Sequence, residues 1–180
     1  MTDHGCVIWL TGLPGAGKTT IARALEAGLR AEGLRVEVLD GDEIRQTLSP
    51  ELGFSPKDRE LHNRRVIYLA GLLARHGVVA IVALISPYRA VRDAARAELG
   101  RFVEVWVKCS LEECIRRDPK GHYRRALDGA NPQMTGVSAP YEPPESPELV
   151  VDTEQWPLDR CVAEIRRTAA ALGYLPPPGV

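Results

Sequence analysis

A glycine-rich segment of eight residues constrains this sequence more than any other feature. Residues 12–19 read GLPGAGKT and match the pattern G-x-x-x-x-G-K-[ST], which is typical of phosphate-binding loops. The segment follows the apolar run Cys6–Leu10 and opens a helical pattern over Lys18–Glu32. The alternative is a glycine-rich turn with an exposed lysine, and the strand–loop–helix context argues against it. The sequence therefore predicts a nucleoside-triphosphate site.

Each residue type in this loop has a physical reason to be there. Glycines let successive backbone N–H groups turn inward toward phosphate oxygens, and the start of the following helix adds a partial positive charge. We expect Lys18 to reach the β- and γ-phosphates and Thr19 to ligate Mg²⁺. The residues expected to contact ATP in this segment are Gly12, Leu13, Pro14, Gly15, Ala16, Gly17, Lys18, Thr19 and Thr20.

Apolar runs alternate with helical patterns along the rest of the chain. The patterns predict strands over 6–10, 36–39, 78–84, 102–107 and 149–151, and helices over 18–32, 42–48, 57–76, 88–99, 111–117 and 158–172. Strands separated by helices indicate right-handed βαβ crossovers. We therefore expect an α/β, three-layer P-loop NTPase fold, with helices flanking a five-stranded parallel sheet and ligands at the carboxyl ends of its strands.

The length of 180 residues predicts a single domain over about 1–175, followed by a loose proline-rich tail at 176–180. Residues 118–147 are rich in proline, glycine and charge. A loop of this length is typical of a binding loop, so we expect a mobile lid over about 118–141.

Charge and hydropathy narrow the classes of ligand and compartment. The formal net charge of −1 lacks the basic excess of a nucleic-acid-binding domain, so small anionic molecules are the expected ligands. No apolar run approaches the roughly 18 residues of a membrane span, and the first residues do not resemble a signal peptide. The four cysteines fit no metal-site spacing. We expect reduced thiols in a cytoplasmic protein.

Two aspartates after the second predicted strand favour a kinase. The chain has no Asn-Lys-x-Asp element to read guanine, and its third strand ends without the carboxylate that many ATPases carry. Asp40 and Asp42 come where a carboxylate can accept a proton from an attacking hydroxyl or hold the Mg²⁺ shell. Asp40 also stands three residues before Glu43, so capping of the next helix is its alternative role. A structural role stays open for Asp42 as well.

Basic and aromatic residues near the predicted strand ends form a second group. Arginine pairs bidentately with phosphate or sulfate oxygens, and candidates for this role are Arg45, Arg59, Arg64, Arg65 and Arg89. Arg64 and Arg65 fit a solvated helix face equally well. Phe54 lies in the polar segment Leu52–Pro56, where it is either a local hydrophobic staple or a platform on which a base stacks.

Seven segments occur in an order that resembles the adenylyl-sulfate kinase family. The resemblance covers about residues 5–172, and it implies phosphorylation of adenosine 5′-phosphosulfate (APS) on its 3′-hydroxyl. The phosphate loop alone is generic, whereas the later segments together are specific. The segments are 12–19 (GLPGAGKT), 40–42 (DGD), 52–59 (LGFSPKDR), 64–65 (RR), 85–89 (ISPYR), 117–121 (RDPKG) and 140–142 (PYE).

The resemblance implies a role for most candidates. Asp40 matches the acid that acts as base toward the 3′-hydroxyl, Arg45 and Arg59 match positions that hold the phosphosulfate, and Phe54 matches the aromatic that stacks on the APS adenine. Ser86 matches a serine described as a phosphoserine intermediate, although in-line transfer needs no covalent step and a hydrogen-bonding or turn role fits equally.

The remaining implied positions complete the expected site. Lys120 lies in the lid near phosphate oxygens, Arg117 lines the ATP adenine by cation–π contact, and Arg89 either is structural or helps to order the site. The catalytic candidates are Asp40, Lys18 and Ser86. The residues expected to contact APS are Asp40, Asp42, Arg45, Phe54, Arg59, His62, Ile85, Ser86, Lys120, Met134 and Thr135.

The sequence departs from the family pattern at two positions. His62 stands where the family usually has asparagine, so a pH-dependent charge enters the site; an exposed helical histidine is the alternative. Met134 stands where the family usually has phenylalanine, the second wall around the adenine. Methionine offers sulfur contact but no ring face, so we expect looser APS stacking.

The resemblance implies a kinase that transfers the γ-phosphoryl of MgATP to APS and yields 3′-phosphoadenosine 5′-phosphosulfate (PAPS). It also suggests a homodimer, with ATP sulfurylase as a neighbour in sulfate assimilation and with no nucleic-acid or membrane partner. Two alternatives stay open: a P-loop kinase for another small-molecule hydroxyl, and a non-catalytic nucleotide-binding module.

Overall fold

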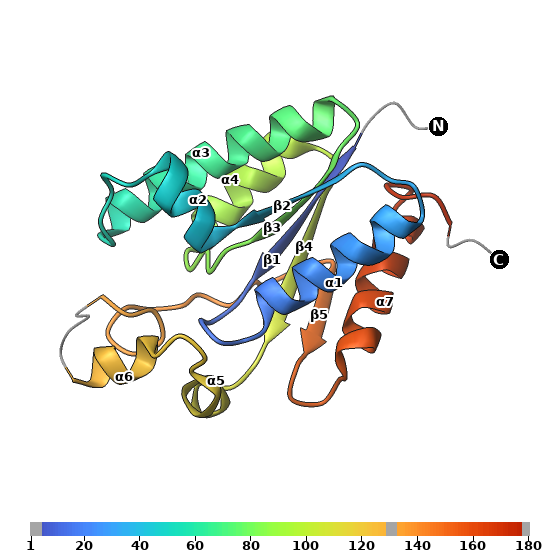
Figure 1. The fold of residues 1–180 in the computed structure, drawn as a ribbon. Helices are drawn as coiled ribbons and strands as arrows, with labels where there is room; N and C mark the ends of the chain where they lie inside the picture. Colours follow the sequence, from blue (N-terminus) through green and yellow to red (C-terminus); the bar gives the residue numbers. More distant parts are fainter. Residues whose placement is uncertain (1–4, 129–132, 178–180) are drawn as a thin grey trace.

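The computed structural model describes residues 5–128 and 133–177, which form a parallel sheet between two layers of helices (Figure 1). The strand order is β2-β3-β1-β4-β5, and all four neighbouring pairs are parallel. The predicted five-stranded α/β P-loop fold is confirmed. The strands are β1 (Cys6–Thr11), β2 (Val36–Asp40), β3 (Val79–Ala83), β4 (Phe102–Lys108) and β5 (Leu149–Asp152).

The helices cover both faces of this sheet. Helices α1 and α7 lie on one face, and α3 and α4 lie on the other (Figure 1). The helices are α1 (Lys18–Ala31), α2 (Gly41–Leu48), α3 (Pro56–Arg75), α4 (Arg89–Leu99), α5 (Leu111–Arg117), α6 (His122–Leu127) and α7 (Leu158–Ala171). No helix within the described ranges is long and apolar enough to cross a membrane.

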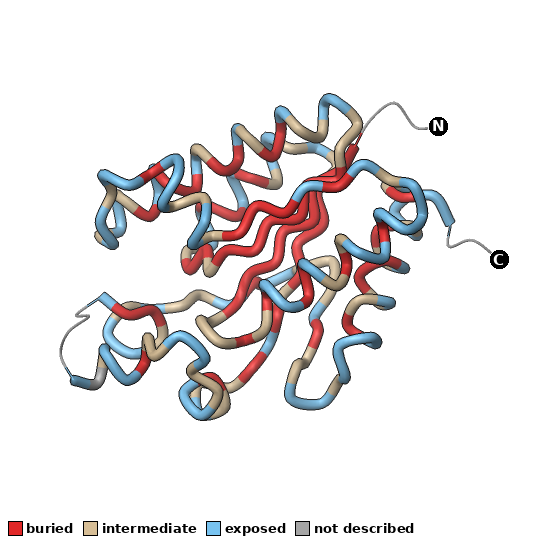
Figure 2. The backbone as a smooth tube through the Cα atoms, viewed as in Figure 1, coloured by how far each residue is buried: buried red, intermediate tan, exposed pale blue. Residues whose placement is uncertain are grey.

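The central strand explains why two separate cores form. All six residues of β1 are buried, and the strands stand out as the buried centre of the molecule (Figure 2). Successive side chains point to opposite faces. Ile8 and Leu10 therefore join the core under α1 and α7, whereas Val7 and Trp9 join the core under α3 and α4. This double burial is why the strands read as continuous apolar runs in the sequence.

Short polar side chains set where several helices begin. The Asp40 carboxylate accepts a hydrogen bond from the backbone N–H of Asp42 at the start of α2 (3.1 Å). Ser55 caps α3 through the N–H of Asp58 in the same way (3.2 Å). Such caps satisfy amides that have no partner within the helix. Capping by Asp40, one of the two roles predicted for it, is therefore present.

In the described part of the segment predicted as a loop over 118–147, residues His122–Leu127 form the helix α6, which the sequence pattern did not indicate. Asp118 accepts hydrogen bonds from the backbone N–H groups of Tyr123 (3.2 Å) and Arg124 (3.1 Å), which stabilises the first turn. Tyr123 is buried and donates to the carbonyl of Pro14 (2.8 Å). Tertiary contact with the phosphate loop thus supports a helix too short to be stable alone. Residues 129–132 of the predicted lid and 178–180 of the predicted tail lie outside the described residues.

Candidate active site

A cavity of about 810 Å³ opens at the carboxyl edge of the sheet, between the phosphate loop, α2, the start of α3 and the lid. This volume suits nucleotide-sized ligands. Most residues predicted from the sequence line it: Pro14, Gly15, Ala16, Gly17, Lys18, Thr19, Thr20, Asp40, Asp42, Arg45, Phe54, Arg59, His62, Ile85, Ser86, Arg117, Lys120, Met134 and Thr135. Gly12 and Leu13 are not among its lining residues.

The phosphate loop has the backbone geometry that its glycines predict. Gly15 and Gly17 adopt left-handed φ values of 81° and 101°, which side chains disfavour. Gly12 has a different reason for being glycine, because a Cβ there would lie 2.4 Å from the carbonyl oxygen of Val107. Gly17 precedes α1 without a side-chain cap. The first amides of α1 therefore remain available to an anion.

Lys18 is buried at the base of this loop. Its Nζ donates to the carbonyls of Gly12 (2.8 Å) and Leu13 (2.7 Å). Burial lowers the pKa of Lys18 to about 8. Cys114, Asp42 and Asp40 act in the opposite direction and raise this pKa by a smaller amount. A bound phosphate would provide the negative partner that this ammonium group lacks within the loop.

The Thr19 hydroxyl and the Asp40 carboxylate lie together in this cavity, next to the phosphate loop. The Thr19 hydroxyl donates to Asp40 Oδ2 (2.7 Å), while Asp40 Oδ1 accepts from the N–H of Asp42. A hydroxyl and a carboxylate are the hard oxygen donors that Mg²⁺ takes together with phosphate oxygens. Asp40 therefore combines a helix cap with a place between the phosphate loop and the rest of the cavity.

Asp42 and Lys120 connect α2 to the lid by an ion pair. Partial burial raises the pKa of Asp42, but the hydrogen bond and charge of Lys120 outweigh this effect and lower the pKa below its usual value. The same hydrogen bond raises the pKa of Lys120. Both side chains are more than half exposed, so the pair contributes little to stability. Its position nevertheless ties the lid across the cavity.

Arg45, Arg59 and Phe54 form the opposite wall. The two guanidinium groups lie 4.8 and 5.7 Å from the Phe54 ring centroid, within cation–π distance. Phe54 is 49% exposed and lines the cavity, which is more exposure than a hydrophobic staple would have. A stacking role for this ring stays a prediction.

Arg59 also holds the far part of the lid. Its Nε donates to the carbonyl of Phe54 (2.9 Å), Nη1 to the Thr135 hydroxyl (2.8 Å) and Nη2 to the carbonyl of Gln133 (2.6 Å). Met134 lies between these two lid residues, buried and lining the cavity. One arginine thus contacts both the segment that carries Phe54 and the lid on either side of Met134.

His62 is buried, so the alternative of an exposed helical histidine is wrong. Its Nδ1 lies 3.0 Å from the Ser49 hydroxyl. Burial, together with the positive charges of Arg45 and Arg65, lowers the pKa of His62 to about 4. The side chain is therefore neutral near pH 7, and the charge expected to vary with pH in the physiological range is absent.

Ser86 is buried beneath the cavity, and its hydroxyl has partners on both sides. The Ser86 Oγ donates to Asn63 Oδ1 (2.8 Å) and accepts from the indole N–H of Trp9 (3.2 Å). The neighbouring carbonyl of Ile85 accepts from Thr11 (2.7 Å). A hydroxyl held in this way is not presented to a phosphoryl donor, so the geometry favours the hydrogen-bonding role over a phosphoserine.

Arg117 lies at the other end of the cavity. It donates to the hydroxyl (3.1 Å) and carbonyl (3.0 Å) of Thr153 and to Glu113 (2.7 Å). Trp156 lines the same cavity a few residues further along the chain. This end lies beside the phosphate loop, because the Thr153 hydroxyl also donates to the carbonyl of Ala16 (2.9 Å).

Three arginines predicted near the site do not line the cavity. Arg64 is exposed and lies near Glu60, which agrees with the solvated helix face predicted as its alternative role. Arg65 pairs with Glu51, and Arg89 pairs with Glu145. Their charges are therefore balanced by neighbouring carboxylates outside the cavity.

Sequence reasoning missed several lining residues. Asn63, Tyr123, Gln133, Thr153 and Trp156 line the cavity but belong to no signature that we used. Thr153 directly follows β5, and side chains after a parallel strand lie at the ligand-binding edge. That rule could have identified Thr153, whereas the other four depend on how the lid, α3 and the last loop fold.

Comparison with known proteins identifies the family. The family model described as "Adenylylsulphate kinase" matches residues 4–152. This chain belongs to the adenylyl-sulfate kinase family. It is 54% identical over 173 residues to the probable adenylyl-sulfate kinase of Pyrococcus abyssi, covering 96% of this chain and 99% of that protein. It is 47% identical over 175 residues to the adenylyl-sulfate kinase of Synechococcus sp. strain JA-3-3Ab, covering 97% and 99%.

A solved structure of the family extends this likeness to three dimensions. The Mycobacterium tuberculosis APS kinase in complex with AMPPNP and APS matches with a TM-score of 0.89 at 37% identity, covering 93% of this chain and 99% of that one. Adenylyl-sulfate kinases use a nucleotide donor and a nucleotide acceptor. The cavity, with a phosphate loop on one side and an arginine-flanked aromatic on the other, has one feature suited to each.

Proposed function

We propose that this chain transfers the γ-phosphoryl group of MgATP to the 3′-hydroxyl of APS and releases PAPS and ADP. One observation carries the proposal: in a member of this family, one cavity joins the phosphate loop to Asp40 and then to the wall formed by Arg45, Phe54 and Arg59. We call the phosphate loop with Lys18 and Arg117 the donor side. We call Arg45, Phe54, Arg59, His62 and Met134 the acceptor side.

On the donor side, the loop amides and Lys18 bind the phosphates of ATP, and Arg117 lies where the adenine would stack. Lys18 must exchange its two carbonyl partners for phosphate oxygens. The Thr19 hydroxyl would hold Mg²⁺, and the bound ion would neutralise charge on the phosphates of ATP, which leaves the Asp40 carboxylate to act as base.

On the acceptor side, the adenine of APS stacks on Phe54, and Arg45 and Arg59 bind its sulfate and phosphate oxygens. Neutral His62 offers a hydrogen bond without adding positive charge. This arrangement directs the 3′-hydroxyl toward Asp40, which lies between the two sides.

The chemical step is a direct in-line displacement. A bond forms between the 3′-oxygen and the γ-phosphorus, while the bond between that phosphorus and the β,γ-bridging oxygen breaks and ADP leaves. Asp40 accepts the 3′-hydroxyl proton and later releases it to water. Lys120 and Arg59 hold two parts of the lid near the cavity, which limits transfer to water.

The decisive experiment incubates the protein with MgATP and APS and follows PAPS, with adenosine monophosphate as a control acceptor. We expect rapid product formation that depends on the sulfate group, because Arg45 and Arg59 offer two cations to the phosphosulfate. Phosphorylation of APS at only trace rate, with another hydroxyl compound phosphorylated rapidly, would establish the alternative small-molecule kinase. ATP binding without any phosphorylated acceptor would establish a non-catalytic module.

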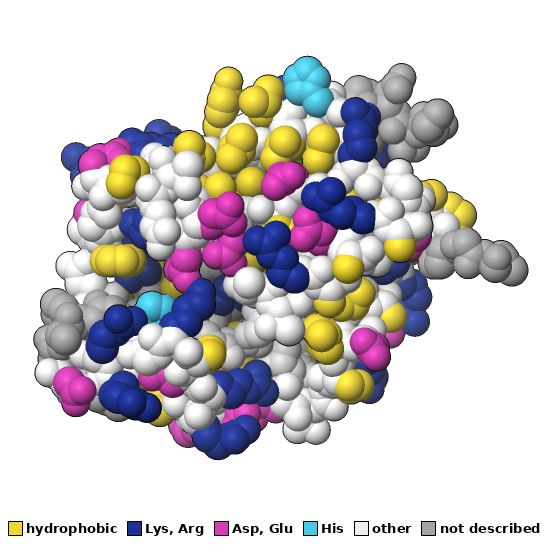
Figure 3. All heavy atoms as spheres, in the orientation of Figure 1, with side chains coloured by type: hydrophobic (Ala, Val, Ile, Leu, Met, Phe, Trp, Pro, Cys, Tyr) yellow, Lys and Arg dark blue, Asp and Glu magenta, His cyan; other side chains and the backbone are white. Residues whose placement is uncertain are grey.

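A homodimer formed through α3 is the proposed assembly. Leu61, Tyr68 and Leu72 are exposed at helical spacing, with Tyr68 69% exposed. Figure 3 shows hydrophobic side chains gathered over the α3 region at the top of the view. Exposed Arg64 and Glu60 flank this stripe with opposite charges, which suits a self-complementary interface. Light scattering of the wild type and of Tyr68→Glu tests it: a monomer in both overturns the dimer.

The cytoplasm is the proposed compartment, with ATP sulfurylase as the expected supplier of APS. All four cysteines are buried and free in the structure, as expected for reduced thiols. Fractionation of the source cells, followed by detection of the chain, tests the compartment directly.

A further inference from the structure

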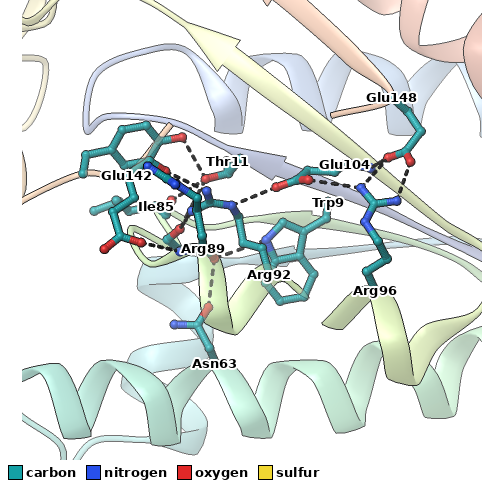
Figure 4. A network of polar contacts seen from close by, with 12 residues as sticks. Trp9, Thr11, Asn63, Ile85, Arg89, Arg92, Arg96, Glu104, Glu142 and Glu148 are labelled. Carbon is teal, nitrogen blue, oxygen red and sulfur yellow. Dashed lines mark hydrogen bonds and ion pairs between the residues drawn. The ribbon is translucent and has the colours of Figure 1, made fainter. Parts of the chain in front are cut away.

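A buried polar network lies behind the acceptor side of the cavity, with Arg92 at its centre (Figure 4). Arg92 is 1% exposed, and its guanidinium contacts three segments of the chain. Nε donates to Glu104 Oε1 on β4 (2.8 Å), Nη1 to the carbonyl of Ser86 (2.5 Å), and Nη2 to the carbonyl of Glu142 (2.6 Å). Ser86 lies in the turn between β3 and α4, and Glu142 directly follows the lid.

The charges of this network balance without a ligand. Glu104 accepts from Arg92 with one carboxylate oxygen and from Arg96 with the other (3.1 Å). Glu148 pairs with Arg96 and also accepts from the N–H of Glu104 (2.6 Å). Two arginines therefore face two glutamates, and Arg92 does not line the cavity. Its contribution must pass through the groups that it holds.

The first of these groups is the turn at Ser86. Within the described ranges, Ser86 is the only residue other than glycine with a left-handed φ, at 43°. Such a conformation persists where the surroundings hold it, and here Arg92 holds the carbonyl while Trp9 holds the hydroxyl. The hydroxyl then donates to Asn63, and Asn63 Nδ2 donates to the carbonyl of Arg59 (2.7 Å). A continuous path of hydrogen bonds thus connects Arg92 to the acceptor side.

The second group is the chain as it leaves the lid. Besides its contact with Arg92, Glu142 donates its N–H to the carbonyl of Pro87 (2.8 Å) and accepts from the N–H of Arg89 (2.8 Å). The adjacent Tyr141 hydroxyl lies 3.0 Å from that of Thr11, which bonds to the carbonyl of Ile85. The end of the lid is therefore fastened to the same turn that Ser86 occupies.

We propose that Arg92 is a positioning residue that couples acceptor binding to the lid. It fixes the Ser86 turn, which contacts the acceptor side through Asn63, relative to Glu142, where the chain leaves the lid. This inference rests on the proposed kinase function. It predicts different effects on the two sides of the cavity. Disturbing Arg92 weakens APS binding and raises the share of ATP that is hydrolysed by water, while MgATP binding on the donor side stays intact.

The test compares Arg92→Lys with Arg96→Lys. Lysine at position 92 keeps the charge beside Glu104 but lacks the planar fork that reaches both carbonyls. We expect the KM for APS to rise at least tenfold, the KM for MgATP to stay within twofold, and a larger share of ATP to be hydrolysed without transfer. Arg96 lies on the same helix as Arg92 and also pairs with Glu104, but it contacts neither carbonyl. Arg96→Lys should therefore leave both KM values and the hydrolysed share within twofold of the wild type.

A general loss of thermal stability would not explain such a split, because it would lower the active fraction or raise both KM values alike. Equal changes in the two KM values of Arg92→Lys, with an unchanged transferred fraction, would overturn the proposal. If that variant does not fold, Tyr141→Phe removes one hydrogen bond at the same junction without disturbing an ion pair, and the same split of about two- to fivefold is expected. No split there overturns the proposal as well. Wild-type turnover of APS is measured first, and its absence would instead overturn the proposed function.

Discussion

The donor and acceptor sides of this cavity are built in different ways. The donor side consists mainly of one uninterrupted segment, residues 12–20, whose loop is shaped by left-handed Gly15 and Gly17 and closed by α1. The acceptor side draws Arg45 from α2, Phe54 from the next loop, Arg59 and His62 from α3, and Met134 from the lid. A local segment can be recognised by spacing alone, whereas a wall assembled from four elements depends on long-range contacts.

The two sides also differ in what holds them. Lys18 is held by carbonyls of its own loop, five and six residues away in sequence. Arg59 is held by lid residues 74 and 76 positions away. Substitutions on the donor side should therefore act locally, whereas those on the acceptor side should propagate to the lid.

Asp40 lies at the junction of the two sides, and its loss should have the largest effect. Asp40→Asn keeps an oxygen that can cap α2 and an amide NH2 that can donate to the Thr19 hydroxyl, but it removes the base. We expect kcat to fall by about 10²–10⁴-fold, while ATP affinity changes little. Turnover assays and titration of nucleotide against the fluorescence of Trp156, which lines the cavity, separate the two quantities. Equal losses in turnover and nucleotide binding would contradict the role of Asp40 as base.

Arg59→Lys should separate the acceptor side from the donor side. Lysine cannot make the three contacts of the guanidinium with Phe54, Thr135 and Gln133. We expect the KM for APS to rise roughly 10–100-fold, in line with the 1.5–3 kcal/mol of charge-assisted hydrogen bonds. The KM for MgATP should change less than threefold. A comparable rise in both constants would show that the two sides are not independent.

His62→Asn tests the lowered pKa of His62 through the pH dependence of the free energy of unfolding. The His62 pKa is about 4 in the folded chain and about 6.5 when unfolded, so the unfolded state binds more protons between these values. The free energy of unfolding therefore falls as the pH drops below 6.5, because protonation of His62 then favours the unfolded state. Between pH 7 and pH 5, the wild type should lose about 2 kcal/mol more unfolding free energy than His62→Asn. Urea unfolding at both pH values measures this, and parallel losses would show that His62 does not titrate in this way.

Met134→Phe should have the smallest effect and the opposite sign. A ring opposite Phe54 adds a second stacking face, and base–aromatic stacking contributes about 1–3 kcal/mol. Because the larger ring must also fit a buried position, we expect the lower end, a decrease of about 3–10-fold in the KM for APS. Phe54→Leu is the matched control and should raise the same constant. A Met134→Phe enzyme with unchanged or weaker APS binding would mean that residue 134 does not face the adenine.

The Asp42–Lys120 pair marks a limit of reasoning from the sequence. Both residues were expected at the APS site, but their mutual ion pair could not be foreseen, since 78 residues separate them. The same holds for α6, which is stabilised because Asp118 accepts from the N–H groups of its first turn and Tyr123 packs on the phosphate loop. Local propensity in this segment is weak, and contacts between distant segments outweigh it.

By itself, the sequence determined the layered parallel fold, the phosphate loop and the kind of chemistry. Each of these follows from local patterns: apolar strands of fixed length, helices with a regular apolar face, and a glycine spacing that few backbones can satisfy. Only the tertiary structure decided that His62 is buried and neutral, that the Ser86 hydroxyl is fully engaged, and that Arg59 and Arg92 connect the lid to the sheet. The physical reason is that burial and long-range hydrogen bonds depend on which segments the fold brings together, and spacing along the chain does not encode that distance.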